Sequence, residues 1–189
     1  MITILILLAP GFETSEAIVP IDFLRMAGIT VTIASVGVPG LVVRDTSGVA
    51  YVCDARFEDV KGQDFGGVIV PGGNPGAWNL AANADVVELV KTYFAANKLV
   101  SSICAATAIV LADKCNIVNG KKVVGYPAEA LNKIITDKGG IIPDAFVVTD
   151  SNLVTAKGPG VSAQYAIELI KYIAGADKAE EIRKSTVMQ

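Results

Sequence analysis

The sequence predicts an α/β protein with a mostly parallel sheet that is covered by helices on both faces. Two observations predict it. Short apolar strand segments alternate with helical segments along the chain, and right-handed crossovers join such strands into one parallel sheet. Hydrophobic residues make up 52% of the chain and charged residues 19%, which suits strands that are buried on both faces. We expect one domain, residues 1–189, because a chain of this length buries a full core.

The N-terminal segment predicts a first strand–helix unit. The apolar run TILILL at residues 3–8 indicates a buried strand. Residues 11–28 indicate a helix that has Thr14 or Ser15 as its N-cap and a glycine at its end. Pro20 lies within this helix. We expect it near the first turn, where a missing N–H is tolerated.

The next segments continue the alternation after one interruption. Residues 30–37 predict a second strand. Residues 39–54 alternate in polarity around a Ser-Gly pair, which favours a hairpin or an extended excursion over a third helix. Residues 65–73 form a short apolar run that ends in Pro-Gly-Gly and predicts a strand, and residues 75–96 have a helical pattern.

The second half of the chain repeats the same unit and closes with helices. A strand followed by a helix is expected twice, at residues 98–104 and 105–114 and at residues 121–127 and 128–140. A hairpin that turns at Asp150-Ser151-Asn152 is expected within residues 145–160. Closing helices are expected at residues 162–175 and 178–187.

Charge, hydropathy and cysteine content exclude several classes of function. The net charge is −3 and the basic residues are spread along the chain, so the sequence lacks the basic stripe that nucleic acid requires. The longest apolar runs are well short of the roughly 20 residues that span a bilayer. No basic region precedes the first of them, so we expect no membrane or secretory segment and a cytoplasmic location. Three widely spaced cysteines and no histidine indicate reduced thiols and argue against a transition-metal site.

Cys104 lies between a predicted strand and a predicted helix. One interpretation is that it is a small, buried apolar residue. The other is that it is a nucleophile on a sharp strand-to-helix elbow, where the small Ala105 and Ala106 permit the turn. The N–H groups that begin the helix would lower the pKa of such a thiol and favour the thiolate, which is a route to activation without histidine.

Two other strand-to-helix turns are candidates, because ligands of open α/β sheets bind beyond the carboxyl ends of the strands. Gly72 and Gly73 either only permit a tight turn or present their N–H groups to an oxyanion. Glu16, in the first turn of the first helix, is by default a carboxylate that interacts favourably with the helix dipole.

Four segments together resemble one protein family. They are LLAPGFETSEAIVPIDFLRMAG, VIVPGGNPGAWNL, SSICAATAIVLA and VTAKGPGVSAQYAIELI, and they extend in order over nearly the whole chain. They resemble the ThiJ/PfpI superfamily, in the branch of the Parkinson disease-associated protein deglycase DJ. The resemblance implies a flavodoxin-like three-layer α/β sandwich that usually forms a homodimer.

The resemblance also implies roles for individual residues. Cys104 matches the family's reactive elbow cysteine, which is readily oxidised to sulfinic acid, and Glu16 matches the carboxylic acid that hydrogen-bonds it. Gly72, Gly73 and Ala105 match the backbone N–H donors around that sulfur. The arrangement is physically coherent, since burial near a second developing negative charge raises the pKa of a carboxyl group and lets it donate to a thiolate or sulfinate.

The chain departs from this branch at two positions. Tyr126 stands where the branch has a histidine beside the cysteine, so a Cys-His dyad and its protease chemistry are excluded, and we expect Tyr126 to line the pocket. Where the family has an arginine that contacts the oxidised cysteine across the dimer, the alignment has Ser47, with Arg44 nearby but displaced.

Two classes of function follow from the resemblance. The first is a cofactor-free enzyme of carbonyl stress with glyoxalase III-like or deglycase activity on methylglyoxal, glyoxal and their early adducts. There, Cys104 attacks the aldehyde, backbone N–H groups stabilise the oxyanion and Glu16 moves protons. The second is a non-catalytic redox sensor or chaperone that is switched by oxidation of Cys104. The expected partners are these small molecules and a second copy of the chain, without nucleic acid, membrane or metal.

Overall fold

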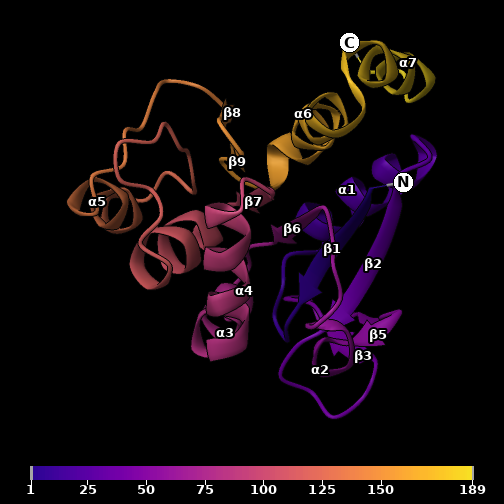
Figure 1. Ribbon diagram of the computed structural model, residues 1–189, viewed down its shortest axis with the longest axis horizontal. Helices are drawn as coiled ribbons and strands as arrows, with labels where there is room; N and C mark the ends of the chain where they lie inside the picture. Colours follow the sequence, from indigo (N-terminus) through magenta and orange to yellow (C-terminus); the bar gives the residue numbers. More distant parts are fainter. Residues whose placement is uncertain (1, 189) are drawn as a thin grey trace.

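A seven-stranded sheet forms the middle layer of the molecule in a computed structural model that describes residues 2–188 (Figure 1). Its strand order is β5-β2-β1-β6-β7-β9-β8, and every neighbouring pair is parallel except β8 and β9. The strands are β1 (Thr3–Leu8), β2 (Thr30–Ser35), β5 (Ala55–Arg56), β6 (Gly67–Val70), β7 (Leu99–Ile103), β8 (Val147–Asp150) and β9 (Leu153–Ala156). The sheet brings the carboxyl ends of β1, β6 and β7 side by side.

Helices cover both faces of the sheet, because successive side chains of each strand point to opposite faces. In β1, Ile4, Ile6 and Leu8 pack in one core with α1 (Thr14–Met26), α6 (Ser162–Ala174) and α7 (Ala176–Ser185). Leu5 and Leu7 pack in the other core. That core takes side chains from α2 (Phe57–Val60), α3 (Gly76–Ala82), α4 (Ala84–Ala95), the π-helix η1 (Thr107–Lys114) and α5 (Glu129–Asp137). The prediction of a three-layer α/β fold with a mostly parallel sheet is confirmed.

The expected excursion is a small hairpin beside the start of α1. Its strands β3 (Val42–Arg44) and β4 (Ala50–Val52) are antiparallel and form a separate two-stranded sheet. The turn is held by Asp45, whose carboxylate accepts the N–H groups of Ser47 and Val49, each at 2.9 Å, and the hydroxyl of Thr14. These hydrogen bonds lower the pKa of Asp45. The hairpin is therefore tied to the first residue of α1.

Two helical segments differ from the prediction. The N-cap of α1 is Glu13, whose carboxylate accepts the N–H of Ser15, so the expectation of Thr14 or Ser15 is wrong. Pro20 lies in the second turn and not the first, and its missing N–H leaves the carbonyl of Glu16 without the usual helical donor.

The helical pattern of residues 75–96 corresponds to two helices. They meet at Asn83, whose side-chain oxygen accepts the N–H groups of Asp85 and Val86 and so caps α4. A polar N-cap residue within a continuous helical pattern thus starts a new helix. The preceding residues form α3, a separate short helix that follows the end of β6.

The expectation of a strand at residues 121–127 is wrong. Within the described residues this segment makes only a single bridge, between Lys122 and Ile141. The N–H of Val124 donates to the hydroxyl of Thr155 at 3.0 Å, and that of Tyr126 donates to the carbonyl of Cys104 at 3.0 Å. The segment therefore crosses the carboxyl ends of β9 and β7 instead of pairing along them.

The expected hairpin near the C-terminus is present as β8 and β9, with Ser151 in the left-handed region at φ 57° in its turn. The short 3₁₀ helix η2 (Pro159–Val161) links β9 to α6. No helix within residues 2–188 is long and apolar enough to cross a membrane.

Candidate active site

Cys104 occupies a strained elbow between β7 and η1. Its φ of 62° lies in the left-handed region, which costs a residue other than glycine conformational energy. The elbow is held from two sides, because the N–H of Cys104 donates to the carbonyl of Ala156 and its own carbonyl accepts the N–H of Tyr126, each at 3.0 Å. The side chain is partly exposed. Backbone strain of this kind is concentrated at functional sites, where it displays a side chain at the sheet edge.

Two backbone N–H groups point at the sulfur of Cys104, those of Ala105 and Gly73. Gly73 has a φ of 98°, and a Cβ atom there would lie 2.4 Å from the carbonyl oxygen of Gly11. No other residue fits this position without movement of the backbone. The glycine therefore permits the close approach that directs its N–H to the sulfur.

Glu16 lies in the first turn of α1 and is fully buried. Its Oε2 accepts the N–H of Gly72 at 2.9 Å. The resemblance implied that this N–H is directed at the sulfur, but it is engaged with the carboxyl group instead. Its Oε1 is buried and has no hydrogen-bond partner within the described residues apart from the thiol of Cys104, with which the carboxyl group interacts. Burial raises the pKa of Glu16 to about 7 against the lowering effect of these two hydrogen bonds.

The backbone beside the pair admits no larger residue at Gly72. A Cβ atom on Gly72 would lie 2.5 Å from Oε2 of Glu16 and 2.7 Å from Cβ of Cys104. A Cβ atom on Gly158 would lie 4.0 Å from both the sulfur of Cys104 and Oε1 of Glu16, so these two atoms face the same point. The N–H of Gly73, which follows β6, and the buried carboxyl of Glu16, which follows β1, thus both approach the sulfur.

Glu16 and Cys104 titrate as a pair. Burial, the charge of Glu16 and its hydrogen bond raise the pKa of the Cys104 thiol to about 12, while the N–H groups of Ala105 and Gly73 lower it. The expectation that the helix N–H groups bring the pKa of Cys104 below its ordinary value is therefore wrong: these groups lower the pKa, but burial and the charge of Glu16 outweigh them, and beside an ionised Glu16 the thiol keeps its proton. Above about pH 7 the pair has lost one proton and keeps one. The thiolate forms when that remaining proton moves to Glu16.

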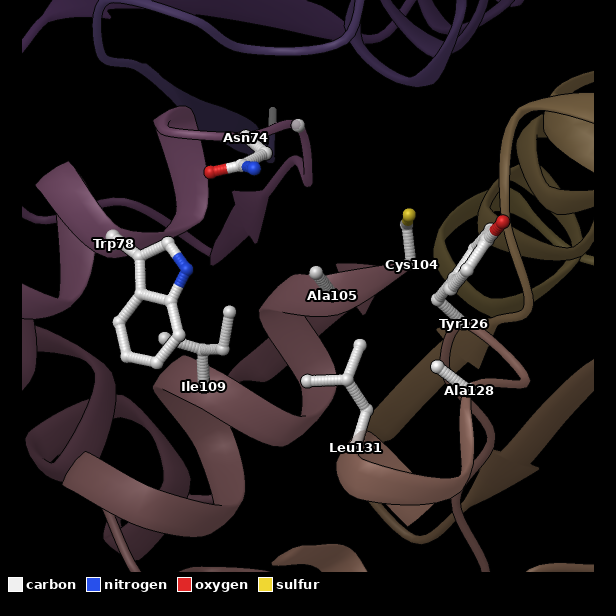
Figure 2. A pocket seen from close by; sticks show the side chains of 9 residues that line it. Asn74, Trp78, Cys104, Ala105, Ile109, Tyr126, Ala128 and Leu131 are labelled. Atoms are coloured by element: carbon white, nitrogen blue, oxygen red, sulfur yellow. The ribbon is translucent and has the colours of Figure 1, made fainter.

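The sulfur opens into a pocket of about 320 Å³. Figure 2 shows Trp78 on one side and Tyr126 on the other, with Ile109 and Leu131 between them and Cys104 at the same opening. Tyr126 lines the pocket, as expected, and the residue is 48% exposed. Sequence reasoning missed the other wall residues, which are Asn74, Trp78, Ile109, Ala128 and Leu131. A signal was available for Trp78 and Ile109, since each lies in the first turn of a helix that begins at the same sheet edge.

The two residues considered for the family's arginine contact belong to the hairpin. The guanidinium group of Arg44 donates to the carbonyl of Gly48 at 2.7 Å, and the hydroxyl of Ser47 donates to Asp45 at 2.9 Å. Neither lines the pocket. Among residues 2–188, no three His, Cys, Asp or Glu side chains gather closely enough to hold a metal ion.

Fold and site together define an α/β protein that displays a cysteine on a strand-to-helix elbow, with a buried carboxyl group beside its sulfur. The chain matches the DJ-1/PfpI family profile over residues 2–172 and belongs to that family. The resemblance drawn from the sequence is thus confirmed.

Relatives of similar length match this chain over nearly its whole length. The Parkinson disease protein 7 homolog of Danio rerio is 32% identical over 187 residues, which cover 98% of this chain and 96% of the relative. Protein dj-1beta of Drosophila melanogaster is 30% identical over 184 residues, which cover 97% and 96%. The solved structure of Drosophila DJ-1beta superposes with a TM-score of 0.91 at 30% identity, covering 100% of this chain and 98% of that one. Oxidized Toxoplasma gondii DJ-1 superposes with a TM-score of 0.90 at 29% identity, covering 99% and 98%.

Proposed function

We propose that this protein is a cofactor-free, cysteine-dependent enzyme that converts α-oxoaldehydes such as methylglyoxal and glyoxal to hydroxy acids. One observation carries the proposal: the sulfur of Cys104 receives two backbone N–H groups, lies beside the buried carboxyl of Glu16 and opens into a pocket. A nucleophile, oxyanion donors and a group that moves protons are what addition to an aldehyde requires.

The first step is addition of the sulfur to the aldehyde carbon. In the reactive form of the pair the proton is on Glu16 and the negative charge is on Cys104. As the carbon–sulfur bond forms, the aldehyde oxygen becomes an oxyanion, and we assign its stabilisation to the N–H groups of Gly73 and Ala105, which are directed at the sulfur. The proton of Glu16 then neutralises the oxygen, which gives a hemithioacetal and an ionised Glu16.

The second step is an internal transfer of hydrogen. The Glu16 carboxylate removes the hydrogen of the former aldehyde carbon as a proton and returns it to the neighbouring carbon. The proton of the hemithioacetal hydroxyl moves to the ketone oxygen, so that the ketone becomes a hydroxyl and the former aldehyde carbon regains a carbonyl. The product is a thioester of Cys104. Water cleaves it, releases the hydroxy acid and restores the thiol, so the sum is one α-oxoaldehyde plus one water, with no oxidant or reductant. A pKa of about 7 suits Glu16 to both directions of proton transfer near neutral pH.

The rate at which the protein consumes methylglyoxal at saturating concentration tests this function. Cys104→Ser should lower kcat about a hundredfold or more, and Glu16→Gln should lower it roughly a hundredfold, the usual contribution of a general acid–base group. Cys53→Ser is the matched control, because Cys53 is a buried thiol outside the pocket. Equal rates for the wild type and Cys104→Ser would sink the proposal. The same variants tested on glycated peptide, with and without a scavenger of free dicarbonyl, separate direct deglycation from removal of free dicarbonyl.

A redox sensor is the alternative that one observation favours. Cys53 and Cys115 are each 3% exposed, whereas Cys104 is partly exposed and has donors that suit sulfinate oxygens as well as an oxyanion. In this function oxidation of Cys104 changes the affinity for a partner and turnover is incidental. For either function we expect a homodimer in the cytoplasm, which sedimentation and cell fractionation would check.

A further inference from the structure

The pocket is much larger than the smallest substrates require. Its volume of about 320 Å³ is roughly ten times the ~30 Å³ that one water molecule occupies in the liquid. The methyl group of methylglyoxal fills a small part of that space and leaves the wall farthest from the sulfur without contact. Apolar walls that a ligand does not reach contribute nothing to its binding.

The walls select for apolar and aromatic groups. Trp78 presents its indole from α3 across the pocket from Tyr126, while Ile109 and Leu131 form the surface between them (Figure 2). None of the nine described residues that line the pocket is charged. Trp78 is 49% exposed, so a large apolar residue in the wall of the pocket is in contact with water. A ring between Trp78 and Tyr126 would remove this surface from water.

We infer that the preferred substrates are α-oxoaldehydes with an aromatic or branched apolar substituent, and that Trp78 is the residue that determines this specificity. The inference rests on the proposed function, since it assigns the substituent of the same α-oxoaldehyde. The aldehyde carbon reacts at the sulfur of Cys104, and the substituent on the neighbouring carbonyl extends between Trp78 and Tyr126. Phenylglyoxal is the simplest probe: with one water it gives mandelate through the same addition, proton transfer and thioester hydrolysis.

Kinetics compare phenylglyoxal with methylglyoxal. The wild type should have a kcat/KM about tenfold or more higher for phenylglyoxal, the discrimination typical of an added apolar group that fills a pocket. Trp78→Ala should remove most of this ratio by raising KM for phenylglyoxal, and Trp78→Phe should restore it. Tyr172→Ala, a partly exposed aromatic residue on α6 outside the pocket, is the matched control and should leave the ratio unchanged. The rate of Cys104→Ser is subtracted, so that reaction of phenylglyoxal with arginine side chains does not count.

Binding gives a readout that does not depend on turnover. Trp78 is the only tryptophan of the chain, so intrinsic fluorescence reports on this wall of the pocket. In Cys104→Ser, mandelate should change the fluorescence at concentrations at which lactate, its methyl counterpart, does not.

The two experiments distinguish the failure of this inference from the failure of the proposed function. If Cys104 is required for both substrates but the ratio of kcat/KM is near one and survives Trp78→Ala, the inference is overturned and the enzyme remains. If neither aldehyde is consumed through Cys104 but mandelate binds in preference to lactate, the enzyme fails and the assigned pocket specificity stands. Equal response of the fluorescence to both acids overturns the inference.

Discussion

The buried carboxyl of Glu16 should make the stability of this protein fall as the pH rises through neutrality. The perturbation is Glu16→Gln, which keeps the shape of the side chain and an oxygen for the N–H of Gly72 but removes the titration. Glu16 is fully buried, and its pKa is raised from 4.5 to about 7. The folded state therefore holds this proton more tightly than the unfolded state, and the stabilisation is complete below pH 4.5 and lost as the pH rises through 7.

The magnitude follows from the difference between the two pKa values. A difference of about 2.5 corresponds to about 3 kcal/mol, since each pKa unit is worth about 1.36 kcal/mol. Because part of the loss occurs below pH 5, the wild type should lose about 2.5 kcal/mol relative to Glu16→Gln between pH 5 and pH 8. The chain has no histidine, so no other side chain with an ordinary pKa titrates in this window. The raised pKa of Cys104 has its effect above pH 9.

Urea denaturation at fixed protein concentration, at pH 5, 6, 7 and 8, measures this difference. Glu180→Gln is the control, because its hydrogen bond with Arg183 lowers the pKa of Glu180 from 4.5 to about 2, so that both its folded and its unfolded pKa lie below the window. Its free energy of unfolding should run parallel to that of the wild type. Identical slopes for the wild type and Glu16→Gln, or a wild type that becomes more stable towards pH 8, would refute the raised pKa of Glu16.

Three further predictions concern the thiols and the glycine at the site. Glu16→Gln should lower the pKa of Cys104, because the neighbouring charge is removed. The pH profile of iodoacetamide alkylation measures this pKa, and an unshifted midpoint would show that Glu16 and Cys104 are not coupled. Mild peroxide should add two oxygens to Cys104 before either buried cysteine is modified, as located by mass spectrometry, and the reverse order would exclude the sensor. Gly73→Ala should cost about 3 kcal/mol or more in urea denaturation, since its Cβ meets backbone atoms. Gly37→Ala, at a φ of 73° in open space, should cost only about 1 kcal/mol, and equal costs would contradict the close approach.

Most of the fold was predictable because strand burial and helix periodicity are local properties of the sequence. The runs that became β1 and β6 are apolar on both faces, and the runs that became β1, β6 and β7 are each followed by a pattern that suits a helix. Two features were not local. Residues 121–127 have strand-like composition, but their N–H groups find Thr155 and the carbonyl of Cys104 across strand ends. Glu13 caps α1 because its longer side chain reaches the N–H of Ser15, which residue preference alone does not indicate.

The sequence predicted which residues form the site better than it predicted the hydrogen bonds and contacts between them. Strand ends alone indicated Cys104 and Gly73, and the resemblance supplied Glu16 as the partner of the sulfur. The direction of the N–H of Gly72, towards Glu16 and not the sulfur, depends on the relative heights of β1 and β6. Leu131 lies in a helix far along the chain from α3, so no sequence pattern places it in the wall between Trp78 and Tyr126.

Adjacent strand ends explain how one carboxyl group can serve a chain without histidine. Glu16 follows β1, Gly72 and Gly73 follow β6, and Cys104 follows β7, and these three strands are neighbours in the sheet. The parallel register fixes the three turns at one height, so the buried Oε1 of Glu16 and the sulfur meet without a side chain between them. Here the acid is buried, and the cost of that burial is what raises its pKa to the range in which it can both give and accept the proton of Cys104.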